Sequence, residues 1–137
     1  MWMINPKLLC RQHLLGEHFE IHKAIGNLKH SGNWTRALTR KGFLEPQNAL
    51  NRHNDLVREM VKRKMNHKSP LRLKHVDLPH GNVNLKKSNR DLIKRCKQCK
   101  ENIKNRSAWK YRYFYNTKYR FRNTCTTNDG GWCFTIR

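Results

Sequence analysis

The sequence predicts an all-α fold, a compact three-helix single domain with a basic aromatic C-terminal tail. Apolar residues recur at every third or fourth position in three separate segments, which is the period of an amphipathic helix. From residue 109 onward, aromatic and basic residues alternate instead. A chain of 137 residues is long enough for one domain with a modest core. We therefore expect a helical core over residues 1–108 and an extension, residues 109–137, packed on the same domain.

The first helix is predicted from about Lys7 to His30. The stretch HSGNW should end it, with Gly32 as a turn residue. Its apolar face consists of residues three or four positions apart: Leu14, His18, Ile21, Ile25 and Leu28.

The second helix is predicted to begin at Pro46, which suits a first turn, and to end near Lys64. Its inner face should be Leu50, His53 or Asn54, Val57, Met60 and Val61. A polar stretch without a clear period follows. Ser88 or Asn89 could then cap a third helix, whose stripe is Leu92, Cys96, Cys99 and Ile103.

The tail alternates aromatic and basic residues over 109–124, which favours strands and a short hairpin. Aromatic side chains such as Trp109 and Tyr111 can stack on unpaired bases, and cations such as Lys110 and Arg112 can neutralise phosphates. The alternative is a half-buried strand with its aromatics inside and its cations in solvent. For the cations, the charge of the chain favours phosphate contact.

Thirty Lys and Arg residues against nine Asp and Glu give a net charge of +21. Residues 1–50 hold only seven of these basic residues, so the positive surface comes mainly from the second half. Such an excess costs self-repulsion that a polyanion would relieve, which makes nucleic acid the leading partner and a membrane surface the second. We expect no transmembrane helix, because there is no long apolar run, and no signal peptide at the short, polar N-terminus.

The five cysteines are an odd number, which favours a reducing, intracellular setting over disulfides. Cys96 and Cys99 have the spacing of metal ligands, and Cys125 and Cys133 flank a Gly-Gly turn. These four could form a zinc site. Alternatively, Cys96 and Cys99 are buried thiols on the apolar stripe of the third helix. Cys10 is expected in the core.

The segment RQHLLGEHFEIH, residues 11–22, is rich in histidine and glutamate. His18 and His22 share a helix face at a spacing that suits two metal ligands, but no third ligand is obvious nearby. The order also differs from H-E-x-x-H, so we expect His18 to pack in the core instead. Glu20 points away from both histidines. Near an anionic partner this carboxylate needs either a lysine partner or a role in acid–base chemistry.

Three segments, in order along the chain, resemble the phage endonuclease V type of pyrimidine-dimer DNA glycosylase/AP lyase. QHLLGEHFEIHKAIGNLKH, from Gln12 to His30, resembles the first helix of that family. EMVKRKMNHK, residues 59–68, is similar to the end of its second helix. NIKNRSAWKYRYFY, residues 102–115, is similar to the end of its third helix and the aromatic, basic segment that follows. The resemblance covers residues 1–115 with gaps.

The resemblance implies three helices, with the N-terminal segment threaded between the first two. It also implies that the N-terminal amine, here of Met1, attacks C1′ of a damaged or modified pyrimidine nucleotide, leaves an imine, and cuts the strand by β-elimination. Glu20 matches the family's catalytic glutamate. An α-amine has a pKa of about 8, so part of it is a neutral nucleophile at pH 7.

The same resemblance implies double-stranded DNA as the partner, a monomer inside the cell, and no cofactor for catalysis, although a structural zinc ion is possible. Gln12, His13 and Lys23 match positions of the family that face DNA. We also expect DNA contacts from five residues of the third segment: Arg106, Trp109, Lys110, Tyr111 and Arg112.

Three positions depart from the family pattern. Trp2 follows Met1 where the best-known member of the family exposes a threonine after methionine removal, and methionine is normally retained before so large a residue. Phe19 replaces an arginine that contacts phosphate, and the arm before Gln12 is a few residues shorter. Two alternatives to a glycosylase therefore remain: a non-catalytic basic zinc-containing nucleic-acid-binding module, and a metal-dependent nuclease that uses histidines.

Overall fold

The computed structural model describes residues 1–73 and 76–106. The described residues contain helices and no strand, which confirms the all-α prediction. They form five α-helices rather than the expected three. The tail residues Trp109, Lys110, Tyr111 and Arg112, the cysteines Cys125 and Cys133, and the predicted hairpin lie outside the described residues.

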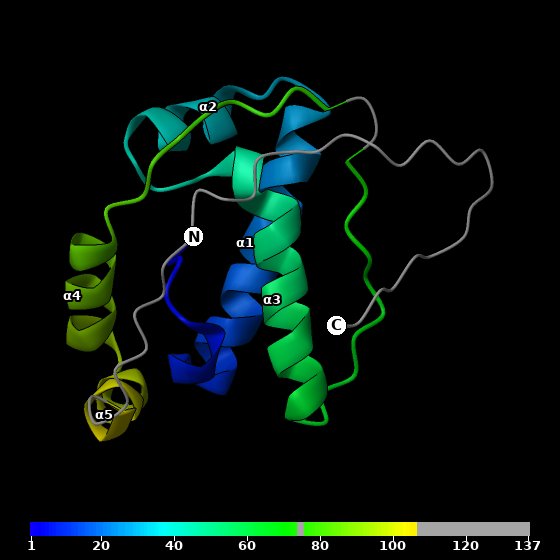
Figure 1. The fold of residues 1–137 in the computed structure, drawn as a ribbon. Coiled ribbons are helices and arrows are strands. Elements are labelled where there is room, and N and C mark those ends of the chain that lie inside the picture. Colours follow the sequence, from blue (N-terminus) through cyan, green and yellow to red (C-terminus); the bar gives the residue numbers. More distant parts are fainter. Residues whose placement is uncertain (74–75, 107–137) are drawn as a thin grey trace, which may run out of the picture.

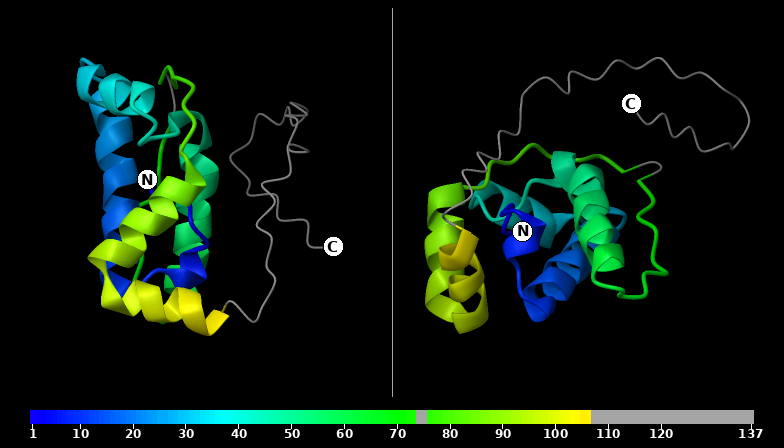
Figure 2. Two further views of the ribbon diagram at one scale, coloured as in Figure 1. Left: turned by 90° about the vertical axis from the view of Figure 1, so that its left-hand side faces the viewer. Right: turned by 60° about the horizontal axis from the view of Figure 1, so that its bottom comes forward.

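Two long helices, α1 (Arg11–Leu28) and α3 (Ala49–Lys62), lie side by side, and the short α2 (Asn33–Arg40) crosses one end of this pair (Figure 1). Helix α4 (Leu85–Arg95) stands apart from them, and α5 (Lys97–Arg106) crosses its end (Figure 2). Short 3₁₀ turns at Pro6–Leu8 and Pro46–Asn48 precede α1 and α3. The N-terminus lies between α1 and α4 (Figure 1).

The apolar face predicted for the first helix is confirmed. Leu14, Ile21 and Ile25 are almost fully buried, and His18 is buried beside them. Helix α1 begins at Arg11, later than expected, because Pro6–Leu8 forms a separate 3₁₀ turn. The guanidinium of Arg63 donates to the carbonyl oxygens of Leu9 and Pro6 at 2.8 and 3.1 Å, which fixes this turn against the end of α3.

The inner face predicted for the second helix is partly wrong. Leu50 and Val61 are 40% and 61% exposed, whereas Arg52 and Leu56 are fully buried. The face is rotated because Arg52 is buried as an ion-pair partner, and charged residues are not counted as apolar when a stripe is read from sequence. Helix α2 was not predicted at all. Its buried positions are the hydroxyl residues Thr35 and Thr39, whose Oγ1 atoms donate to the carbonyl oxygens of Ala24 and Thr35.

The predicted third helix is two helices in the structure. Cys96 adopts an extended conformation (φ −137°, ψ 111°) that ends α4, and α5 starts at the next residue. The N-cap of α4 is Asn84, whose side chain accepts from the Lys87 N–H, rather than Ser88 or Asn89. Leu92 and Cys99 are buried as expected, and Cys96 and Ile103 pack against the core.

Across residues 1–73 and 76–106, no helix has the length and apolar character needed to cross a membrane.

Candidate active site

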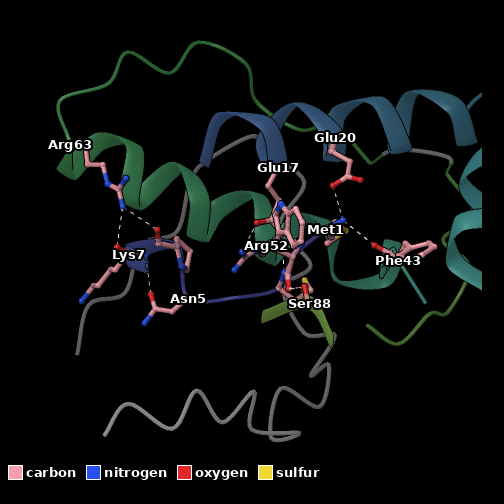
Figure 3. Close-up of polar contacts among 12 residues, drawn as sticks. Met1, Asn5, Lys7, Glu17, Glu20, Phe43, Arg52, Arg63 and Ser88 are labelled. Atoms are coloured by element: carbon pink, nitrogen blue, oxygen red, sulfur yellow. Dashed lines mark hydrogen bonds and ion pairs between the residues drawn. The ribbon is translucent and has the colours of Figure 1, made fainter. Parts of the chain in front are cut away.

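The α-amine of Met1 lies inside the molecule next to a carboxylate of α1. It donates to Glu20 Oε2 at 2.7 Å and to the carbonyl oxygen of Phe43 at 3.0 Å. Met1 is 8% exposed, whereas the Glu20 side chain is 34% exposed and reaches solvent. Figure 3 shows Glu20 pointing from α1 toward Met1, with Phe43 on the opposite side of the amine. The structure therefore brings together the two groups proposed from the sequence.

A second glutamate, Glu17, holds the N-terminal arm, which we define as residues 1–5. Glu17 Oε1 accepts from the backbone N–H groups of Trp2 and Met3 at 2.9 and 3.2 Å. Its carboxylate also pairs with Arg52 of α3, with Nε to Oε1 at 3.0 Å and Nη2 to Oε2 at 2.6 Å. Both side chains of the pair are fully buried. Glu17 therefore joins the arm, α1 and α3 at one point, close to the amine (Figure 3).

The other side of the arm is fixed to α4. The Ser88 hydroxyl donates to the carbonyl oxygen of Trp2 at 2.7 Å, and the Arg95 guanidinium lies 6.0 Å from the centre of the Trp2 ring. The arm is thus bound on both sides within its first three residues. Sequence reasoning missed Glu17 and Ser88, and a signal existed only for Glu17, one of nine acidic residues in a strongly basic chain.

Met1 and Glu20 both line a pocket of about 490 Å³, which we call the amine pocket. Its wall includes Met1, Glu20 and Phe43 on one side and the segment 82–84 with α4 on the other. The charged groups at its edge are Lys41, Lys87, Asp91 and Arg95. The volume lies within the range of pockets that hold small ligands, about 300–1,000 Å³.

The segment 81–83, which leads into this wall, is fixed by hydrogen bonds to Glu45 and Gln47. Glu45 Oε1 accepts from the Val83 N–H at 2.7 Å. The Gln47 side-chain amide makes two hydrogen bonds with the backbone of Gly81, at 2.6 and 3.0 Å. A Cβ atom on Gly81 would lie 2.2 Å from the Leu44 carbonyl oxygen, so this close approach requires glycine.

A second hollow, which we call the aromatic groove, runs along the other side of α1 and shares Glu20 and Trp2 with the amine pocket. Gln12, His13 and Lys23, the residues proposed for DNA contact, all line it. Phe19 and Trp34 add exposed aromatic rings, at 68% and 36% exposure, and Lys23 Nζ lies 5.0 Å from the centre of the Trp34 ring. Arg106, another residue proposed for DNA contact, is the last residue of α5.

The structure groups the cysteines differently from the sequence prediction. Cys96 and Cys99 lie next to Cys10 and His13, and the four ligand atoms are within 4.8 Å of one another. This Cys–His group could hold a metal ion. Cys10 is buried, as expected, but it belongs to this group rather than to the apolar core alone. Burial raises the pKa of the Cys99 thiol to about 12, whereas a hydrogen bond from the Cys99 N–H lowers the pKa of Cys96.

His18 is buried, as predicted, but it does have further histidines nearby. His53 of α3 and His67 each place Nε2 at 3.1 Å from His18 Nε2, and the His22 ring is 4.8 Å from the His18 ring. These further histidines were not obvious beside His18 in the sequence, because His53 and His67 are 35 and 49 residues away from it along the chain. Burial and the neighbouring imidazoles lower the pKa of His18 to about 4, so the His18 imidazole is neutral at pH 7.

A comparison with protein-family models decides the classification. The model described as pyrimidine dimer DNA glycosylase matches residues 1–73, more than half of the chain. The chain belongs to the pyrimidine dimer DNA glycosylase family. The match contains Met1, Glu17, Glu20 and the aromatic groove, and it ends before α4 and the Cys96–Cys99 pair. Membership of this DNA glycosylase family implies DNA binding. No curated protein and no solved structure matched the chain.

Proposed function

We propose that this member of the pyrimidine dimer DNA glycosylase family is a DNA glycosylase with AP lyase activity, in which the Met1 amine is the nucleophile and Glu20 is the acid–base group. The contact of 2.7 Å between the amine and Glu20, at the wall of a pocket of about 490 Å³, is the observation that carries this proposal. An amine and a carboxylate in contact are what imine chemistry at a sugar requires.

In the first step, Glu20 takes a proton from the amine, and the nitrogen lone pair forms a bond to C1′ of the target nucleotide. The bond from C1′ to the base breaks, and the base leaves with its electron pair and gains a proton. The nitrogen then loses a proton, and its lone pair forms a double bond to C1′. The bond from C1′ to the ring oxygen breaks at the same time, and the oxygen keeps the electron pair and takes up a proton, which gives a protonated imine.

In the second step, a proton is removed from C2′, and the 3′ phosphate leaves with the electrons of its bond to C3′. The imine makes the C2′ proton acidic, so a carboxylate can act as the base. Water then hydrolyses the imine and restores the amine. None of these steps uses a metal, and for that reason we assign the Cys–His group a structural role.

The glycosidic bond lies inside a stacked duplex, so a nucleotide has to leave the stack to reach the amine. The amine pocket has room for one, and Lys41, Lys87 and Arg95 at its edge supply positive charge for its phosphates. Phe19 and Trp34 supply exposed rings in the aromatic groove, next to the same Glu20. An aromatic ring can occupy the gap that a displaced base leaves.

Phe19 makes the aromatic groove more apolar than the family pattern implies. An exposed apolar ring here replaces the arginine of the family pattern, so one phosphate contact is exchanged for a surface that can stack on a base. Gln12, His13 and Lys23 remain in the groove and supply polar contacts to DNA. We propose that one chain, bound to intracellular double-stranded DNA as a monomer, contains all the groups needed for the reaction.

The test is strand cleavage of a duplex with one abasic site, and of ultraviolet-irradiated duplex, by the wild type and Glu20→Gln. Glu20→Gln keeps the size of the side chain but removes the base, so it should bind the duplex and lose cleavage by a factor of about 10²–10⁴. Glu101→Gln, an exposed position on α5, is the matched control and should cleave normally. Duplex binding by the wild type without cleavage would instead favour a non-catalytic binding module.

A further inference from the structure

We propose that Cys10, His13, Cys96 and Cys99 form a structural zinc site. This site would link the start of α1 to the junction of α4 and α5. The inference rests on the ligand geometry alone and does not depend on the glycosylase reaction.

The four residues come from two short segments with equal spacing. Cys10 and His13 are separated by two residues, as are Cys96 and Cys99. Cys10 is the N-cap of α1, and Cys96 directly precedes α5, so in each segment the second residue lies in the first helical turn. Pairs of this spacing supply the ligands of three-cysteine, one-histidine zinc sites.

Two of the distances between ligand atoms match those of a tetrahedral zinc site. With the usual Zn–S and Zn–N bond lengths, two sulfurs lie about 3.8 Å apart, and a sulfur and a nitrogen lie about 3.6 Å apart. In the structure, Cys96 Sγ is 3.8 Å from Cys10 Sγ, and Cys99 Sγ is 3.6 Å from His13 Nδ1. Cys10 Sγ is 3.1 Å from the same nitrogen, somewhat closer than in a metal site. All four atoms lie within 4.8 Å of one another.

Backbone groups surround the sulfurs as they do in thiolate sites. The Cys10 N–H donates to Cys99 Sγ at 3.2 Å, and the Cys99 N–H donates to Cys96 Sγ at 3.4 Å. Such donors stabilise negative charge on sulfur, and they hold the ligands in place before the metal binds. Zinc ligation would release the thiol protons, so uptake of the ion should acidify an unbuffered solution.

The site has a consequence for the catalytic end of the molecule. The His13 ring touches the Trp2 ring edge-on, with 5.8 Å between the ring centres, and Ser88 of α4 holds the Trp2 carbonyl. Zinc would therefore fix α4, one wall of the amine pocket, relative to α1 and the N-terminal arm. Ligation through Nδ1 leaves His13 Nε2 as the ring nitrogen available to DNA.

The first experiment measures zinc by mass spectrometry in the full chain, purified from cells without chelators. We expect one zinc per chain that disappears in Cys99→Ser and in Cys96→Ser. The double variant Cys125→Ser/Cys133→Ser is the matched control and should keep its zinc. A wild type without zinc, an unchanged zinc content in Cys96→Ser, or loss of zinc in the control would each overturn this ligand set.

The second experiment covers the case in which Cys99→Ser does not fold. Co²⁺ replaces zinc in the wild-type chain, and its absorption spectrum reports both tetrahedral geometry and thiolate ligands. We expect intense tetrahedral bands together with thiolate charge-transfer bands, and the thiolate bands should be unchanged in Cys125→Ser/Cys133→Ser. A spectrum of octahedral cobalt, or one without thiolate bands, would contradict the site.

Discussion

Replacing Glu17 by glutamine should be one of the most destabilising single changes in this protein. The carboxylate accepts four hydrogen bonds, two from Arg52 and one each from the Trp2 and Met3 N–H groups. Glutamine keeps one acceptor oxygen and turns an NH₂ group toward Arg52. The guanidinium, fully buried, then has no carboxylate to balance it in this pair. Breaking a buried ion pair in this way costs about 3–5 kcal/mol.

The matched control is Asp77→Asn, the same chemical change in an exposed ion pair. Arg36 Nη2 lies 3.1 Å from Asp77 Oδ2, and the two side chains are 45% and 79% exposed. Exposed pairs contribute about 0–1 kcal/mol, so this variant should unfold almost like the wild type. The assay is urea unfolding followed by circular dichroism, which gives the free energy of unfolding and its slope. Equal losses in Glu17→Gln and Asp77→Asn would refute the reasoning from burial.

A double variant separates stability from the positioning of the arm. Glu17→Leu/Arg52→Met replaces the buried pair by apolar side chains, and such replacements are often neutral or stabilising. It should therefore be more stable than Glu17→Leu alone. The Trp2 and Met3 N–H groups still lose their acceptor, so the amine should be less well placed, and the reaction with abasic DNA should remain impaired. Full recovery of both properties would show that Glu17 contributes only to stability.

Three further predictions concern the pocket wall, the arm and the histidine cluster. Gly81→Ala should lower the free energy of unfolding by about 1–3 kcal/mol, since its Cβ would meet the Leu44 carbonyl at 2.2 Å, whereas Gly16→Ala, with open space around its Cβ, should be neutral or stabilising in the same urea assay. Ser88→Ala should leave DNA affinity unchanged but slow the reaction with abasic DNA, because the Trp2 carbonyl loses its donor; an unchanged single-turnover rate would argue against this role. The pKa of His18 is about 4 in the folded protein and 6.5 in an unfolded chain, so between these pH values the unfolded chain binds more protons. The free energy of unfolding should therefore fall as pH falls, by at most about 1.4 kcal/mol per pH unit for this group. His18→Gln should reduce that slope. Burial also lowers the pKa of His22 and His53, so they act in the same direction, with His67, Asn54 and the Ser69 carbonyl as their polar neighbours; a slope of opposite sign would contradict the burial of neutral imidazoles.

The buried face of a helix was predictable where its buried residues are apolar and recur every three or four positions. The face of α1 follows the spacing of Leu14, Ile21 and Ile25, and all three are almost fully buried. Helix α2 was not predictable in this way, because its buried positions are threonines that bond to backbone carbonyls. The rotated face of α3 has a similar cause, since Arg52 is buried only through its partner Glu17, thirty-five residues away.

Charge singled out Glu20 in the candidate site, but the Met1 amine was predictable only through the family resemblance. Resemblance suggested the Met1 amine and Glu20, and the contact between them is present in the structure. No pattern in the sequence connects the arm to Glu17 or Ser88, because these contacts depend on how α1, α3 and α4 pack. The cysteines illustrate the same limit: Cys96 and Cys99 were recognised by their spacing, but Cys10 and His13, at the other end of the described chain, join them only after folding.

The amine of Met1 as nucleophile is the central claim, and borohydride trapping tests it most directly. Borohydride reduces an imine between enzyme and abasic DNA to a stable secondary amine, so the reacting nitrogen can be found by peptide mapping with mass spectrometry. We predict one adduct per chain on the α-nitrogen of an intact Met1, with a strongly reduced yield in Glu20→Gln. No adduct on a duplex that the protein binds, or an adduct on a lysine side chain, would contradict the assignment.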